Sequence, residues 1–383
     1  MRQKLSAMNY IRNNKRRVAV LIVSLALFLI LVYLTRFILS SSTESFRLIL
    51  VEDTKKVQHV RLPDSAFGID AEALGEAAGA AYAEAEDRLM EELGKQEGVE
   101  EVYRVQCMGV TIYAMVGQYH FEFPLGDEKM LTTYMEHMGA TLAEGRMPQA
   151  PGELILAEGV MKNAGLKLGQ KLADEAYQIV GIADSDSYFG SGIKVPERDY
   201  SEMLCILTDG SVTDMTKLLR DMGYEFAESD AWIFDHKKGC EEYEQVWSEV
   251  ETPTTLVFRG VTVVMAVMLL LVYTTTLRDR HAEWCLYCSI GYGRKDIYLS
   301  ILREMLFCFG IAVGTGTLFT AIGMVVIDKT LISPMGLACN YLDFSVIGVI
   351  VCGYAVVFTL LQIPIRYAMY KICTVDVMED ELH

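Results

Sequence analysis

Side chains that carry enzymatic chemistry are scattered along this chain and do not form a known catalytic pattern. The six histidines form no H-E-x-x-H zinc motif, and no serine lies in a G-x-S-x-G turn. A phosphate-binding G-x-x-x-x-G-K-S/T loop is also absent, so the chain is not expected to hydrolyse ATP by itself. We therefore predict a protein that is not an enzyme and has no catalytic residues, in which the energy for any work comes from a partner.

Two short motifs contain residue types that bind metal ions. Residues 184–187 (DSDS) resemble part of a calcium loop, but the downstream glycine and bidentate glutamate are missing, which favours a solvated turn. Cys285 and Cys288 form a C-x-x-C pair without a second pair or a suitably spaced histidine, so zinc is not expected. The sequence predicts no metal and no bound cofactor.

Charge and hydropathy are separated along the 383 residues. The mean hydropathy is +0.24 although the net charge is −17, a combination that is unusual for a soluble globular protein. Residues 41–253 carry 41 of the 51 acidic side chains but only 18 of the 34 basic ones. An acidic chain of this kind has no basic face to neutralise phosphates, so nucleic acid is not an expected partner.

Four segments are long and apolar enough to cross a bilayer, because roughly 20 helical residues match a hydrocarbon core of about 30 Å. None has a charge near its centre, which argues against an ion-coupled transporter. We predict an α-helical membrane protein with four transmembrane helices, one before and three after a mixed α+β extracytoplasmic domain. The helices are expected at 18–40, 254–277, 304–327 and 344–366, and the domain at 41–253.

Basic residues predict the orientation of these segments. Lysines and arginines are concentrated in the N-terminal segment 1–17 and in the loop 278–303, so both are expected in the cytoplasm. Alternation along the chain then places 41–253 and the short loop 328–343 outside and the tail 367–383 inside. The acidic residues of that tail weigh little in this rule. The first apolar run exceeds the roughly 7 to 15 residues of a signal-peptide core, which favours an uncleaved anchor.

The segment 41–253 has mixed local patterns. An Ala-, Glu- and Leu-rich stretch without proline predicts a long helix over 70–97, ended by Gly98. Runs rich in β-branched and aromatic residues predict strands over 99–116 and 177–182. Helices are also expected over 211–222 and 240–250. The last one approaches the second membrane segment with only Pro253 intervening, so it is a candidate stalk.

The loop 278–303 has a pattern that suits contact with another molecule. Ala282, Cys285, Leu286, Ser289 and Ile290 recur at helical spacing, which predicts a short amphipathic helix over 279–290. Gly291 and Gly293 then interrupt it, and a second helical run leads into the third membrane segment. Such a helix suits the transmission of force from a cytoplasmic motor. The alternative is an interfacial helix that lies among lipid headgroups.

Several motifs of the chain, in this order, resemble the MacB/FtsX-type permeases of ABC transporters. The family's signature between its second and third membrane helices is similar to 278–283 (RDRHAE), Ile290-Gly291, Ile297 and Glu304. Four motifs resemble the core of the MacB-like extracytoplasmic domain, and the basic approach to the first helix is similar too. These are residues 144–148 (EGRMP), 152–156 (GELIL), 165–169 (GLKLG), 179–182 (IVGI) and 10–17 (YIRNNKRR).

The resemblance implies a half-transporter in a bacterial cell membrane, which pairs with a separate ABC ATPase subunit that binds the ATP. A homodimer, or a heterodimer with a second permease, is expected, in contact with membrane lipid. By family analogy, Glu283, Ile290, Gly291 and Ile297 would contact the ATPase or shape that contact. Tyr292 and Gly293 depart from the usual pattern, in which a small residue and then serine or alanine follow.

Gly310 and Gly314 form a G-x-x-x-G pattern in the third membrane segment, with Gly316 and Gly323 nearby. Small residues at this spacing allow two helices to cross closely. Glycine is also common in membrane helices in general, so the pattern by itself leaves the contact open. We predict helix packing at Gly310 and Gly314.

Two functions fit these features. The first is ATP-driven export or extraction of a peptide, lipid or antibiotic-like substrate. The second is an FtsX-like mechanotransmitter or sensor, in which the outer domain regulates another extracytoplasmic protein without transport. The outer domains of FtsX-type relatives are generally smaller than this one, which favours the first function.

Overall fold

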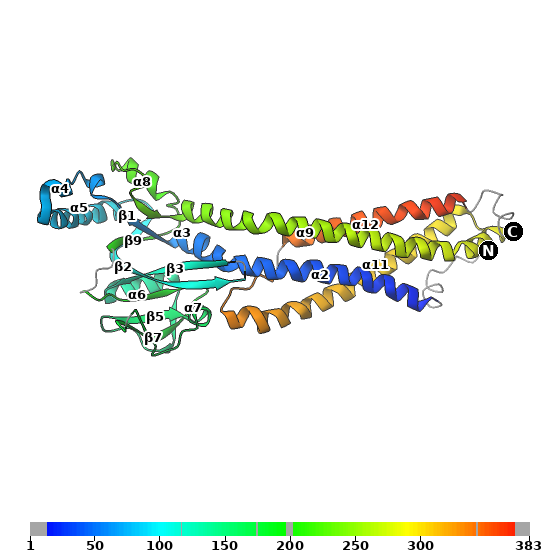
Figure 1. The fold of residues 1–383 in the computed structure, drawn as a ribbon, viewed down its shortest axis with the longest axis horizontal. Coiled ribbons are helices and arrows are strands. Elements are labelled where there is room, and N and C mark those ends of the chain that lie inside the picture. Colours follow the sequence, from blue (N-terminus) through cyan, green and yellow to red (C-terminus); the bar gives the residue numbers. More distant parts are fainter. Residues whose placement is uncertain (1–13, 116, 174, 197–201, 342–343, 372–383) are drawn as a thin grey trace. The chain divides into compact units, whose positions relative to one another are not determined.

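The structure is a computed structural model that describes residues 14–115, 117–173, 175–196, 202–341 and 344–371. The chain divides into two compact units, which are shown in Figure 1. We call Met1–Ser40, Glu251–Asp328 and Asn340–His383 the helical unit, and Ser41–Val250 with Lys329–Cys339 the sheet domain.

Long apolar helices build the helical unit (Figure 1). They are α2 (Lys15–Arg47), α9 (His236–Asp279), α11 (Arg294–Ile327) and α12 (Phe344–Lys371), with the short helix α10 (His281–Ser289) between α9 and α11. Their common core contains Phe28, Phe309 and Tyr354, whose rings meet edge to face at centroid distances of 5.8 Å. The Tyr354 hydroxyl donates to the Leu25 carbonyl at 2.8 Å, which satisfies a polar group inside this core.

Four helices of the described residues are long and apolar enough to cross a membrane. They are Val18–Lys56, His236–Asp279, Arg294–Met335 and Ile350–Tyr370. Each overlaps one of the predicted membrane segments, and large apolar side chains such as Leu256, Val263 and Leu271 are exposed along them. The prediction of four apolar helices is therefore confirmed, while the side of the membrane on which each loop lies stays a prediction.

One mixed sheet organises the sheet domain. In the described residues its order is β10-β1-β9-β2-β3-β8-β5-β7-β4, with β6 paired to β7. Among the described residues, β3–β8 and β5–β7 are parallel pairs and the other pairs are antiparallel. The strands are β1 (Val57–Arg61), β2 (Val99–Ala114), β3 (Gly117–Gly126), β4 (Thr141–Gly145), β5 (Glu153–Ala157), β6 (Lys171–Leu172), β7 (Tyr177–Asp184), β8 (Gly190–Ile193), β9 (Glu202–Thr208) and β10 (Trp232–Phe234).

Short helices complete the sheet domain. They are α3 (Thr54–Lys56), α4 (Ala71–Leu74), α5 (Ala78–Leu93), α6 (Glu128–Met138), α7 (Glu158–Ala164) and α8 (Met215–Asp221), and a π-helical turn η1 (Leu48–Asp53) precedes α3. The Asp127 side chain caps α6 by accepting from the Met130 amide. In the same way the Asp214 side chain caps α8 at the Lys217 amide, so that helix starts later than the predicted residue 211.

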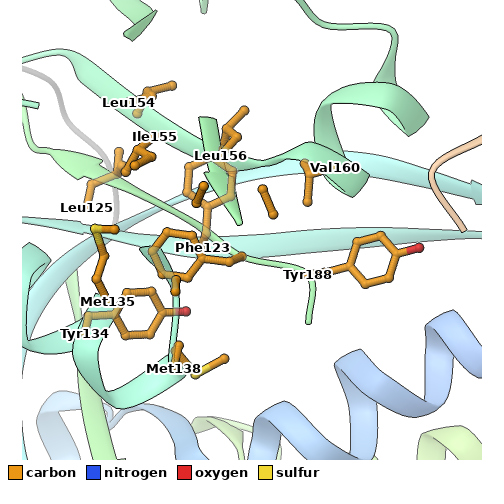
Figure 2. Packing of buried hydrophobic residues seen from close by; sticks show 14 of the residues in the cluster. Phe123, Leu125, Tyr134, Met135, Met138, Leu154, Ile155, Leu156, Val160 and Tyr188 are labelled. Atoms are coloured by element: carbon orange, nitrogen blue, oxygen red, sulfur yellow. The ribbon is translucent and has the colours of Figure 1, made fainter. Parts of the chain in front are cut away.

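The main core of the sheet domain lies where β3, β5 and α6 meet, as Figure 2 shows. Strand β5 is apolar without alternation, because Leu154, Ile155 and Leu156 are all fully buried and the strand lies inside the sheet. The Tyr134 ring of α6 stacks on Phe189 at 5.2 Å. This packed centre positions β5, the strand that contains residues 153–156 of the GELIL motif.

Two local predictions need correction. The long helix expected over 70–97 is interrupted, because Gly75 adopts a φ of +54°, in the left-handed region that ends regular α-helix. The helix that resumes as α5 ends at Leu93. The helix expected over 240–250 belongs instead to the 44-residue α9, which continues through Pro253. By contrast, the strand predicted at 99–116 is confirmed by β2.

Candidate functional site

The segment between α9 and α11 is a tight helix–turn–helix. Helix α10 ends in a left-handed residue, Gly291, with a φ of +92°. The Gly291 amide donates to the Cys288 carbonyl at 2.9 Å, and the Tyr292 amide donates to the Tyr287 carbonyl at 3.0 Å. These two hydrogen bonds close the C-terminal end of α10, and the left-handed backbone at residue 291 favours glycine. Gly293 then caps α11, because its amide donates to the Asp296 carboxylate at 3.3 Å.

One side of α10 is fixed to α11 by a buried ion pair. Nη1 of Arg280, at the start of α10, donates to Oε2 of Glu304 at 2.7 Å, and both side chains are at least nine-tenths buried. The guanidinium also lies 5.3 Å from the ring centroid of Trp284, which is 1% exposed. Because the guanidinium charge is paired inside a packed site, α10 and α11 should move as one body.

The other side of α10 is uncovered in the described residues. Leu286 is 59% exposed and Ile290 is 64% exposed, and the Glu283 side chain is half-exposed, with Oε2 3.6 Å from Nε of the buried Arg280. Exposed large apolar side chains beside a charge are typical of a surface that meets another molecule. The apolar face predicted for this helix is thus its open face, while the buried face is formed by Arg280 and Trp284.

The four residues that the sequence assigned to coupling divide into two groups. Glu283 and Ile290 lie on the open surface, and Gly291 forms the turn beside it. Ile297 is 1% exposed and packs in the core of the helical unit, so it supports the segment from the core and does not lie on the open surface. The predicted coupling residues did not include Arg280, Trp284 or Leu286, although Leu286 was placed on the amphipathic helix and Arg280 lies in the motif 278–283. The i, i+4 spacing of Arg280 and Trp284, with Glu304 inside α11, is the signal that was present in the sequence.

The glycine motif predicted for helix packing lies in α11. A Cβ added at Gly310 or Gly314 would meet nothing within 4 Å among the described residues. Neighbouring glycines instead carry the contact with α2, because a Cβ at Gly316 would lie 3.4 Å from the Ala26 backbone and one at Gly323 would lie 2.9 Å from Leu34. Gly310 and Gly314 therefore leave an open face of small residues.

The four motifs of the segment 41–253 meet around strand β7. Gly145 pairs with Gly181, and on the opposite side of β7 Ile155 pairs with the same glycine. A Cβ at Gly181 would lie 2.5 Å from the Arg146 carbonyl oxygen, and one at Gly145 would strike the Val180 carbonyl. Only glycine allows these backbones to approach so closely.

A surface ion pair joins two of the same motifs. The Arg146 guanidinium makes a bidentate contact with the Glu153 carboxylate, which also accepts from the Gln149 amide at 2.8 Å and the Ala150 amide at 3.2 Å. The Arg146 hydrogen bonds, together with these amides, lower the pKa of Glu153 to about 2. These motifs hold the backbone of the sheet domain in place, and no metal-binding cluster occurs in the described part of the chain.

The helical unit thus combines long apolar helices with a short, partly exposed helix between α9 and α11. Residues 256–371 match the sequence family described as FtsX-like permease C-terminal, a range that includes α10, its turn, α11 and α12. A search of curated proteins finds no match to this chain. The chain therefore contains an FtsX-like permease domain, and this match confirms the resemblance to MacB/FtsX-type ABC transporter permeases.

Solved structures of three bacterial domains were also found. The periplasmic region of MacB from Actinobacillus actinomycetemcomitans is 12% identical, with a TM-score of 0.27, over 49% of this chain and 92% of that one. The extracellular domain of the noncanonic ABC-type transporter YknZ from Gram-positive bacteria is 13% identical, with a TM-score of 0.26, over 47% and 100%. A domain of a permease protein from Porphyromonas gingivalis is 13% identical, with a TM-score of 0.20, over 36% and 71%. These TM-scores lie below 0.5, so the likeness to FtsX-like permeases rests on the match over residues 256–371.

Proposed function

We propose that this chain is the permease subunit of an ABC transporter and that a separate ATPase subunit binds and hydrolyses the ATP. The observation that carries the proposal is the two-sided character of α10. Its open side presents Leu286 and Ile290, and its other side is joined to α11 by Arg280 and Glu304. The open side is the ATPase docking surface, and the ion pair passes its displacement to the membrane helix.

The orientation follows from the same surface. ATP is cytoplasmic, so the loop 278–303, the N-terminal segment 1–17 and the tail 367–383 lie on the cytoplasmic side of a bacterial cell membrane. Residues 41–253 then lie outside. Helix α9 is uninterrupted from His236 to Asp279, so it suits the role of a stalk that carries motion along its length.

A second permease chain completes the transporter. Gly310 and Gly314 form an open strip of small residues on α11, which lets another helix approach closely. ATP-driven motion of the paired chains would then drive export or extraction of a peptide, lipid or antibiotic-like substrate by the outer domains.

The test is recovery of the ATPase with tagged variants of the full chain from its native membrane. Leu286→Glu and Ile290→Glu introduce charge on the open side of α10, and both should leave the fold intact because these side chains are exposed. Leu74→Glu is the matched control, since Leu74 is an exposed leucine on α4 of the sheet domain. We expect a stoichiometric ATPase with the unaltered chain and the control, and a loss of at least about tenfold with either α10 variant, because two apolar anchors carry much of such an interface. Equal recovery with all four chains would contradict the proposal.

Deletion of the chain separates transport from the mechanotransmitter alternative. A change in susceptibility to antibiotics or antimicrobial peptides is the result expected for export. A defect in division or cell shape with unchanged susceptibility would favour regulation of an extracytoplasmic partner.

A further inference from the structure

A cavity of about 220 Å³ lies within the sheet domain. Its lining includes no residue of α10 and none of the motif residues around β7. It is bounded by the end of η1, strands β1, β3 and β10, helix α6 and the first turns of α9. Among the described residues the lining comprises Ile49, Asp53, Thr54, Val57, His59, Tyr119, His120, Phe121, Glu122, Tyr134, Met138, Tyr188, Trp232, Phe234, Lys238 and Glu242.

Aromatic rings form much of this wall. Six of the lining residues are Phe, Tyr or Trp, and they come from β3, α6, β10 and the residue Tyr188 before β8. The Trp232 and Phe234 rings stack at 6.3 Å, and Trp232 is 38% exposed. Figure 2 shows Tyr134, Met138 and Tyr188 at the margin of the core. Aromatic faces attract cations, most strongly where water is partly excluded.

The polar groups of the wall are mainly acidic. Asp53, Glu122 and Glu242 supply three carboxylates, whereas Lys238 is the one lysine or arginine among the described lining residues. Burial raises the pKa of Glu242, against a smaller opposing effect from the positive charge of Lys238. The lining therefore has more acidic than basic side chains, as does the segment 41–253 as a whole.

Two polar atoms of this wall are buried without a hydrogen-bond partner in the structure. They are Oδ2 of Asp53 and Nε2 of His59. Burial raises the pKa of Asp53 to about 8, against a smaller opposing effect from Ser187, and burial lowers the pKa of His59 to about 4. At neutral pH the histidine is thus uncharged, so its ring does not compete with a cation. With a pKa of about 8, the Asp53 carboxyl is protonated at neutral pH while the cavity is empty. A bound ammonium group would lower that pKa, so that Asp53 ionises on binding and its unpaired oxygen accepts from the ammonium N–H.

We propose that this cavity binds an organic ammonium group, with Asp53 as its anionic partner and the aromatic rings as its apolar contacts. The shape and chemistry suit one alkylammonium or arylalkylammonium group, carried either by a small amine or by a lysine side chain of a peptide. The proposal concerns the sheet domain alone, so it stands or falls independently of ATPase docking at α10.

The test is calorimetric titration of the full chain in nanodiscs with 2-phenylethylammonium. 2-Phenylethanol, which has the same ring and chain length without the charge, is the matched probe. We expect the ammonium to bind at least about tenfold more tightly than the alcohol, and Asp53→Asn to abolish most of that difference, because a hydrogen bond to a charged group is lost. Asp221→Asn, an exposed aspartate at the end of α8, should leave binding unchanged.

Each other result overturns the proposal. Equal binding of the two probes would show an apolar cavity without charge recognition, and undetectable binding of the ammonium would remove the site. Unchanged ammonium binding in Asp53→Asn would remove the assigned partner. Thermal unfolding of the variant without ligand shows whether it folds. If it does not, Glu242→Gln replaces it, since that side chain lines the same cavity from α9. We then expect at least a threefold loss of ammonium affinity. An unchanged affinity would overturn the proposal. A lysine-containing tripeptide, compared with its acetyl-lysine form, distinguishes peptide side chains from small amines.

Discussion

The turn after α10 and the loops around β7 both contain glycines and charged residues that resemble family motifs, yet they do different work in the structure. Around β7 the motif residues face one another: Gly145 and Gly181 bring backbones together, and Arg146 binds Glu153. At α10 the apolar residues Leu286 and Ile290 face away from the rest of the chain. The same kind of sequence signal can thus mark either an internal constraint or a surface.

The difference suggests how to separate the two roles experimentally. Substitutions around β7 should change stability and leave docking of a partner to the folded protein unaffected. Substitutions on the open side of α10 should do the reverse. The ion pair behind α10 belongs to both groups, because it stabilises the helical unit and also fixes the surface, so it gives the largest expected effect.

Glu304→Ala should destabilise the helical unit by about 3–5 kcal/mol, because Arg280 would lose its buried carboxylate partner and keep only the half-exposed Glu283 at 3.6 Å. The measurement is thermal unfolding of the full chain in nanodiscs. The double variant Arg280→Met with Glu304→Leu is the control, since it removes both charges and retains apolar volume. Its stability should return to within about 1–2 kcal/mol of the unaltered chain. Equal destabilisation by the single and double variants would show that packing, not the unpaired charge, dominates.

Gly145→Ala should destabilise the sheet domain by about 2–4 kcal/mol, since a left-handed φ of +83° is combined with a clash against the Val180 carbonyl. Gly165→Ala separates the two causes, because Gly165 has a φ of +66° but open space around its Cβ. It should cost only about 1 kcal/mol. Chemical denaturation of both variants, followed by circular dichroism, measures the difference, and equal losses would show that the close approach at β7 contributes nothing.

Much of the fold could be predicted from local patterns. The four apolar helices follow from length and hydropathy, and β2 follows from its run of β-branched and aromatic residues. The interruption at Gly75 was missed because the helical composition of its neighbours outweighed one glycine in the pattern. Pro253 was taken as a boundary, although α9 continues on both sides of it.

The site was predicted only in part, because sequence patterns show periodicity but not which face is covered. The motif identified Ile290 and Gly291, but Arg280 and Glu304 are 24 residues apart and meet only in the folded chain. The cavity of the sheet domain is a stronger case. Asp53 and Trp232 come from distant segments that meet because β10 pairs with β1, and neither belongs to a recognisable motif.

The smallest expected effect is the acid response of the Arg146–Glu153 pair. The pKa of Glu153 in the folded chain, about 2, lies below the unfolded value of 4.5, so the folded state binds fewer protons between these limits. Stability from this pair is therefore present above pH 4.5 and is lost as the pH falls towards 2. Glu153→Gln should flatten the dependence of the melting temperature on pH between about 5 and 3, whereas Glu158→Gln, which removes an exposed helical pair with Lys162, should not. Because both side chains of that control pair are solvated, an equal flattening by the two variants would mean that the β7 motif pair is no more than a surface contact.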